Sequence, residues 1–204
     1  MRKKYLIFSP VITDSFPLHK KIKKDLLKLI SKSKGDSYQN KTSTMTDDLS
    51  KTDWPLSNDF SRPWVKKYGP MIKDFLTKQV LELGYRKIDI SRLWYQQYKQ
   101  NQTHGWHHHA RNYTGAYYVE FPKGSEPTQL LFAENLDKTF SVRAKEGDMI
   151  LFPSYLIHRS PPIKNNKRKT IISWNLDLLD IHPYLFYDRK IRYLEEVPDE
   201  PKSN

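Results

Sequence analysis

The sequence lacks cysteine throughout its 204 residues. This absence excludes disulfide frameworks, thiolate zinc sites and cysteine nucleophiles, so a metal would have to be held by histidine, aspartate or glutamate. Long apolar runs are also missing, and the basic start of the chain is followed by too short an apolar stretch for a signal peptide. We therefore expect a soluble, cytoplasmic (intracellular) protein that has no membrane partner.

Acidic residues are outnumbered, since 35 Lys+Arg stand against 23 Asp+Glu and the formal net charge is +12. Positive fields steer anions, so nucleic acid and acidic proteins are candidate partners. Lysines gather on one face of a helix predicted at about residues 17–32, whose other face is apolar. Such a face is typical of solvated helices as well as of nucleic-acid contacts. A non-catalytic basic nucleic-acid-binding module therefore stays open as one interpretation.

Helical patterns precede a series of short strand patterns. A short strand at 5–12 and the helix at 17–32 are followed by a polar stretch, 33–53, that predicts a loop. A second helical segment begins at Pro63, is interrupted at Gly69-Pro70 and ends at Gly84. Further strands are predicted at 87–98, 113–121, 128–133, 139–143, 149–152, 155–160 and 169–177. This order predicts an α+β chain, mainly β, whose β part is a sandwich or barrel.

Histidines cluster in the predicted β region, at His104, His107, His108, His109 and His158. His107 and His109 are two apart in an extended segment, so their imidazoles point the same way and that of His108 points away. His158, distant in sequence, would complete a facial three-histidine site, which suits Fe(II) and leaves positions open for a cosubstrate and oxygen. A register shift would bring His104 or His108 into the set instead.

A candidate anion site follows ten residues after His158. Arg168 and Thr170 are two apart on a predicted strand, so their side chains share a face. A guanidinium binds a carboxylate through two parallel N–H donors, and a hydroxyl adds a third. A metal ligand, a short spacer and Arg-x-Thr together indicate a pocket that chelates one end of a dicarboxylate and binds the other.

These motifs, with Glu146–Ser154 leading to His158, resemble the 2-oxoglutarate/Fe(II)-dependent oxygenases, in particular their prolyl-hydroxylase-like branch of phage and bacterial type. The likeness covers residues 94–177. It implies one oxygenase domain over 1–204, with a double-stranded β-helix (jelly-roll or cupin-like) core at 86–178. The N-terminal strand and helices of 1–85 would pack outside this core, and 179–204 would form a C-terminal extension.

The resemblance also implies cofactors and site residues. Fe(II) would be held by His107, His109 and His158, with 2-oxoglutarate and O2 as cosubstrates and ascorbate as a reductant. The residues expected to bind 2-oxoglutarate are Arg168, Thr170, Tyr118, Thr114 and Tyr98, and those expected to line the substrate pocket are Trp174 and Asn175. No catalytic side chain is expected beyond the metal site. The prime substrate could be a protein, a nucleic acid or a small molecule, and the branch implies peptidyl proline.

One departure from the family pattern opens an alternative. Most of these oxygenases use His-x-Asp, whereas this chain has His107-x-His109. Three-histidine sites also occur in cupin enzymes that need no 2-oxoglutarate, so a cupin-type metalloenzyme is the second enzymatic interpretation. Arg168-x-Thr170 discriminates between the two, because a cupin enzyme would have no task for it.

Overall fold

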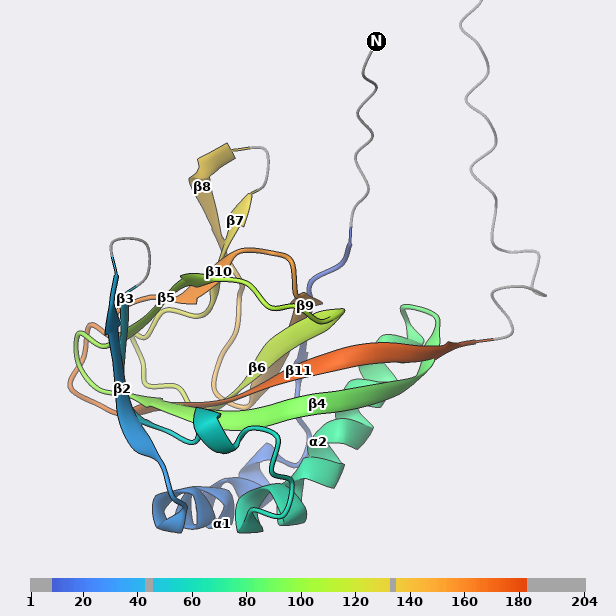
Figure 1. The fold of residues 1–204 in the computed structure, drawn as a ribbon, viewed down its shortest axis with the longest axis horizontal. Coiled ribbons are helices and arrows are strands. Elements are labelled where there is room, and N and C mark those ends of the chain that lie inside the picture. The colour runs from blue at the N-terminus through green and yellow to red at the C-terminus, as the bar shows by residue number, and fades with distance from the viewer. Residues whose placement is uncertain (1–8, 43–45, 133–134, 183–204) are drawn as a thin grey trace, which may run out of the picture.

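A computed structural model of the chain describes residues 9–42, 46–132 and 135–182. Two α-helices, α1 (His19–Lys32) and α2 (Pro63–Leu81), lie side by side beneath a strongly curved antiparallel sheet (Figure 1). Neither helix has the length and hydropathy that crossing a bilayer requires, and this holds for every helix in the described ranges. A 3-10 turn, η1 (Trp54–Leu56), connects the sheet to α2.

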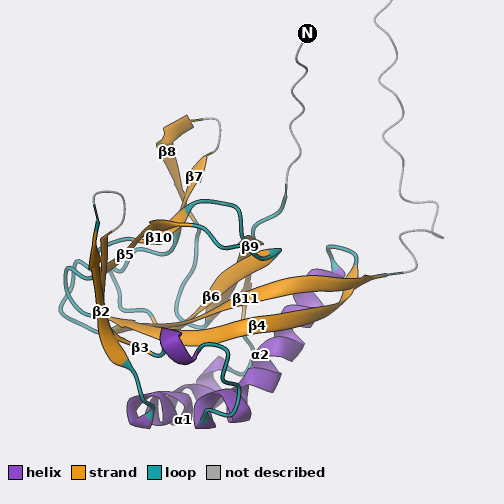
Figure 2. Cartoon of the chain, viewed as in Figure 1, coloured by secondary structure: helices purple, strands orange, loops and turns teal. Residues whose placement is uncertain are grey.

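The described residues form eleven strands. In chain order they are β1 (Ile12–Ser15), β2 (Asp36–Lys41), β3 (Thr46–Thr52), β4 (Tyr85–Tyr98), β5 (Thr103–His107), β6 (Tyr113–Glu120), β7 (Gln129–Phe132), β8 (Asn135–Ser141), β9 (Asp148–Pro153), β10 (His158–Ser160) and β11 (Lys169–Ile181). Their spatial order is β1-β9-β6-β11-β4-β3-β5-β10-β7-β8, with β2 beside β3. The sheet curls so that β5 and β10 lie across from β6 and β11 (Figure 2). This is the predicted double-stranded β-helix with helices outside.

Side-chain alternation along the central strands divides the core in two. The face toward the helices buries Tyr117, Ile172 and Trp174 with Trp64, Ile72 and Leu76 of α2. The opposite face encloses the barrel interior, which contains Tyr98, Tyr118, Ile150, Phe152 and Ile171. Residues that are neighbours in sequence on β6 or β11 therefore belong to different cores.

The polar stretch 33–53, for which the sequence predicted a loop, instead forms the β2–β3 hairpin, with Tyr38 opposite Leu49. The prediction was wrong because the buried face of β3 is mostly polar, with Asp47 and Thr52 flanking Leu49. β3 pairs with both β4 and β5, so this N-terminal hairpin closes one side of the barrel.

Helix α2 continues through Gly69-Pro70, where the sequence predicted an interruption. Proline inside a helix costs about 3 kcal/mol, because a hydrogen bond is lost and its ring crowds the preceding turn. Burial of Trp64 and Tyr68 before Pro70 and of Ile72 after it offsets this cost.

The first predicted strand lies mostly outside the described residues, which begin at residue 9; the observed β1 starts at Ile12 and pairs with β9. Most of the predicted C-terminal extension, 179–204, also lies outside the described ranges, although β11 extends to Ile181.

Candidate metal centre

Strands β5 and β10 bring His107 and His158 together, because they pair antiparallel with these two residues directly opposite each other. Each ring is held at Nδ1 by a backbone carbonyl, 2.7 Å away at Gly105 for His107 and 2.8 Å away at Leu156 for His158. A neutral imidazole that donates from Nδ1 has an unprotonated Nε2. Both Nε2 atoms are therefore available as metal ligands, in the tautomer that metal-binding histidines usually adopt.

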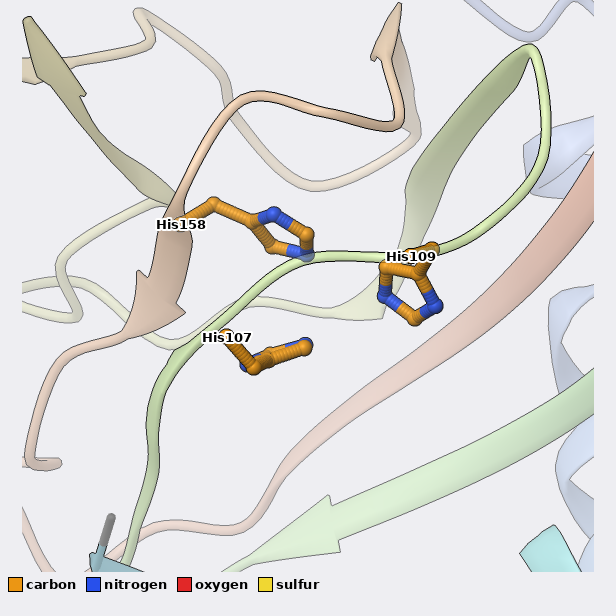
Figure 3. A group of neighbouring side chains, drawn as sticks. All are labelled: His107, His109 and His158. Atoms are coloured by element: carbon orange, nitrogen blue, oxygen red, sulfur yellow. The ribbon is translucent and has the colours of Figure 1, made fainter. Parts of the chain in front are cut away.

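His109 completes the group from the loop after β5, where its backbone N–H donates to the Ser154 carbonyl at 2.9 Å. The ligand nitrogens of His107, His109 and His158 all lie within 4.8 Å of one another. In Figure 3 the rings of His107 and His158 extend from their strands toward that of His109. Three neutral nitrogen donors that converge from two strands and a loop fit a divalent transition metal with open coordination positions.

Burial keeps these rings neutral. It lowers the pKa of His158 well below the usual value, with His107 and His109 as further causes. It also lowers the pKa of His109 to about 3, assisted by His107, His108 and Arg92. The pKa of His107 falls for the same first reason. At neutral pH no proton has to be displaced from the three rings before a metal binds.

The two alternative histidines occupy other positions. His104 stacks on His107, with ring centroids 3.9 Å apart, and its Nδ1 lies 3.2 Å from Nε2 of Gln96. Its Nε2 lies 3.6 Å from a carboxylate oxygen of Asp47. Both nitrogens of His104 therefore face protein groups. His108 is exposed.

Two adjoining cavities meet at the histidine triad. The inner one, about 30 Å³, reaches toward Tyr98, Thr128 and Ser160 inside the barrel. The outer one, about 340 Å³, opens toward the β2–β3 hairpin and η1. The residues that line both are Trp94, Gln96, His104, His107 and His109.

A buried lysine lies behind the inner cavity. Lys169, only 1% exposed, donates from Nζ to Ser160 Oγ at 2.9 Å and to the Glu126 carbonyl at 3.2 Å. The rings of Tyr98, Tyr118 and Phe121 surround it, with centroids 5.4–5.9 Å from Nζ. Burial lowers the pKa of Lys169 to about 7. Within the described ranges no carboxylate forms a salt bridge with this ammonium group.

Arg168 immediately precedes β11, and its side chain does not line either cavity. Its guanidinium donates two hydrogen bonds to Glu120, at 2.8 and 2.9 Å, and its side chain is 45% exposed. Thr170 donates to the same carboxylate. The sequence was right that these two side chains share a face, but the structure does not bring that face to the triad.

The other expected site residues divide between the two cores. Tyr98 and Thr114 line the inner cavity, and Tyr118 lies in the barrel interior with its hydroxyl against Thr128. Asn175 lines the outer cavity, and its assignment to a substrate pocket stays a prediction. Trp174, expected beside it, instead packs in the core that faces the helices.

Sequence reasoning missed Lys169, although strand alternation contained the signal. Lys169, Ile171, Ser173 and Asn175 have the same parity, and the last three all line the cavities. Asn175 was already assigned to the pocket, so counting back from it in steps of two would have selected Lys169 rather than Arg168. Asp47 and Trp54 had no such signal, because the hairpin and turn that position them were not predicted.

Comparison with known proteins finds a family match over the part of the chain that contains the three histidines. Residues 92–175 match a family described as "Putative 2OG-Fe(II) oxygenase". No curated protein sequence matches the chain. Among solved structures, a 2OG-Fe(II) oxygenase family oxidoreductase from Burkholderia pseudomallei is similar at TM-score 0.66 and 9% identity, covering 84% of this chain and 87% of the other.

Two prolyl hydroxylases also share the fold. That of Trichoplax adhaerens, in complex with a hypoxia inducible factor peptide, has TM-score 0.57 and 17% identity over 81% of this chain and 82% of its own. The prolyl-4-hydroxylase of Pseudomonas putida has a TM-score of 0.52 and 12% identity, and the match covers 81% of this chain and 91% of the other. At these identities the structures establish the fold. The segment that matches the family, residues 92–175, contains all three triad histidines.

Proposed function

We propose that this chain, whose residues 92–175 match the 2OG-Fe(II) oxygenases, hydroxylates a substrate that binds in the outer cavity. His107, His109 and His158 would hold the iron, and Lys169 would bind the distal carboxylate of 2-oxoglutarate. The observation that carries the proposal is the convergence of three histidines, two of which have Nδ1 bonded to backbone carbonyls.

Bound Fe(II) would supply the oxygen chemistry that couples conversion of 2-oxoglutarate to succinate and carbon dioxide with oxidation of the substrate. The residues of the chain have other tasks. The backbone carbonyls of Gly105 and Leu156 orient two ligand rings, and the surrounding barrel limits access of water to the site. No side-chain general base is required.

Lys169 replaces Arg168 in the role of cosubstrate anchor. A buried ammonium without a carboxylate partner favours an anion, because ion pairing offsets its desolvation. To accept the distal carboxylate, Lys169 would exchange its hydrogen bond with Ser160 for the ligand. Tyr98 and Tyr118, whose ring centroids lie 5.4 and 5.9 Å from Nζ, would contact the bound diacid. The inner cavity of about 30 Å³ holds about one water molecule, so side chains must move when the diacid enters.

The cupin-type alternative uses the same three histidines without a dicarboxylate. Lys169 now provides the discriminating feature, since a cupin enzyme would have no task for a buried lysine bonded to Ser160, a residue that lines the inner cavity. Peptidyl proline remains the substrate that the resemblance implies, and ascorbate the expected reductant.

The direct test measures succinate formed from 2-oxoglutarate by the full chain with Fe(II), ascorbate and oxygen. We expect slow uncoupled turnover that stops when iron is chelated. His109→Ala should lose bound metal, and His108→Ala, a change at the exposed neighbour, should retain it. Succinate no higher than in the metal-free control, in protein that binds iron, would support the cupin alternative.

A further inference from the structure

The outer cavity has a wall that the oxygenase core does not supply. The β2–β3 hairpin and η1 contribute Tyr38, Asp47, Leu49 and Trp54, while the core contributes Trp94 and two of the triad histidines, His107 and His109. A molecule in this space of about 340 Å³ would lie between the metal ligands and the hairpin. The hairpin side chains are therefore in position to select the substrate.

Asp47 is the formally charged side chain of this wall, whose described lining includes neither lysine nor arginine. The residue is 5% exposed, and its Oδ1 accepts the Gly105 N–H at 2.9 Å and lies 3.6 Å from His104 Nε2. Among the described residues no lysine or arginine lies within ion-pair distance of it. Buried carboxylates are normally paired with a cation. The Asp47 carboxylate can therefore form an ion pair with a cationic group of a bound molecule.

Aromatic side chains line the same cavity as this carboxylate, and one of them has an unused donor. Trp54 and Trp94 meet edge to face with centroids 4.5 Å apart, and Tyr38 contributes a third ring. Aromatic faces attract cations, and the Arg92 guanidinium already lies 5.0 Å from the Trp54 ring. The indole N–H of Trp94 is buried with no acceptor in the described part of the chain. A ligand carbonyl would satisfy it.

We infer that the outer cavity binds an amino-acid residue with a cationic side chain, of lysine or arginine type, whose charge pairs with Asp47 and whose backbone carbonyl accepts from Trp94. This inference rests on the proposed function, because it identifies the substrate of the same site. It favours a cationic residue over proline, whose neutral ring has no donor for a carboxylate.

The test uses the full chain loaded with Zn(II) and 2-oxoglutarate, which prevents turnover. Binding of Nα-acetyl-lysine N-methylamide is measured by ligand-observed NMR beside its neutral analogue Nα-acetyl-norleucine N-methylamide, the corresponding proline probe and n-butylammonium. We expect the lysine probe to bind about tenfold more tightly than norleucine or proline, from one ion pair and the ring contacts. Asp47→Asn, which keeps an acceptor for Gly105, should remove that preference.

Asp48→Asn is the matched control, because Asp48 bonds to Gln39 and Gln102 and does not line the cavity. It should keep the lysine preference. Norleucine or proline binding as tightly as lysine in the wild type would overturn the inference without any variant, as would an unchanged preference in Asp47→Asn. Equal binding of n-butylammonium would overturn the carbonyl contact and the assignment to an amino-acid residue. Because the NMR readout needs no turnover, it is independent of the succinate assay that tests the proposed function.

Discussion

Lys169 places a titratable ammonium group among aromatic rings, bonded to one hydroxyl and one carbonyl. In an apolar interior such a group is costly when charged, and burial lowers its pKa to about 7. A residue whose charge is costly in the empty protein gains most when an anion arrives. A buried lysine at this position is therefore consistent with a site that binds an anion, because ion pairing would offset the desolvation cost of the ammonium group.

Replacing Lys169 should abolish tight cosubstrate binding. We expect Lys169→Met to weaken 2-oxoglutarate binding by roughly thirty- to several-thousand-fold, because loss of one partner of a buried charge pair costs about 2–5 kcal/mol. Arg168→Ala should change the affinity little, since its guanidinium is engaged by Glu120. Isothermal titration into Zn(II)-loaded protein measures both variants. The reverse ranking would restore the original assignment to Arg168.

The affinity for 2-oxoglutarate should also depend on pH. The pKa of Lys169 in the empty protein lies near 7, well below that of an unfolded lysine, so the neutral amine predominates above pH 7. Binding of the dianion requires the ammonium form and therefore takes up a proton. The dissociation constant should rise by up to about tenfold per pH unit between pH 7 and 9. Lys169→Met should show no such slope, and a flat wild-type profile would contradict this account.

At the scale of the secondary-structure elements, one buried ion pair joins three of them: η1, α2 and β4. Asp53, just before η1, accepts from Arg62, from Trp64 Nε1 at 2.9 Å and from the Tyr95 N–H of β4 at 2.8 Å. Arg62 also donates to the Leu93 carbonyl. The network fixes η1, and with it Trp54, against β4 and α2.

We expect Arg62→Met to lower the free energy of unfolding by about 3–5 kcal/mol, because it leaves the Asp53 carboxylate buried without a cation. Arg86→Met removes an exposed ion pair with Asp180 and should change stability little. Urea unfolding of both variants gives the comparison. Equal effects would mean that the Asp53 network adds no more stability than a surface pair.

Prediction of the elements from sequence succeeded where apolar periodicity was strong and failed where polar groups are buried. Helix α1 and strands β6, β9 and β11 follow clear apolar patterns and lie close to their expected bounds. The β2–β3 hairpin has almost none, because its buried face contains Asp47 and Thr52. Those polar residues are stabilised by partners from β4 and β5, which a local pattern does not contain.

For the whole molecule, metal and cosubstrate should stabilise the fold by mass action. A ligand at one hundred times its dissociation constant adds about 2.7 kcal/mol, provided that it binds only the folded chain. We expect Zn(II) to raise the melting temperature of the wild type, and 2-oxoglutarate to raise it further only when the metal is present. Calorimetry of His158→Ala provides the control, which should respond to neither ligand. Stabilisation by 2-oxoglutarate without metal would place the diacid away from the triad.

The sequence alone determined the chemistry available to this protein. It excluded thiolate ligands, supplied the His107-x-His109 pair and a distant His158, and predicted a β barrel behind two helices. Each of these depends on residue type and on local period, which the chain itself contains. Division of the chain into N-terminal, core and C-terminal segments stays a prediction.

Only the tertiary structure decided which side chains face the site. On a strand a shift of one residue exchanges the two faces, so the choice between Arg168 and Lys169 depends on which face of β11 meets the barrel interior. That face is set by pairing of β11 with β4 and β6 and by the helices packed on its other side. The same long-range pairing brings Asp47 to His104, fifty-seven residues along the chain, because β3 lies beside β5. Contacts between residues so distant in sequence leave no periodic trace in it.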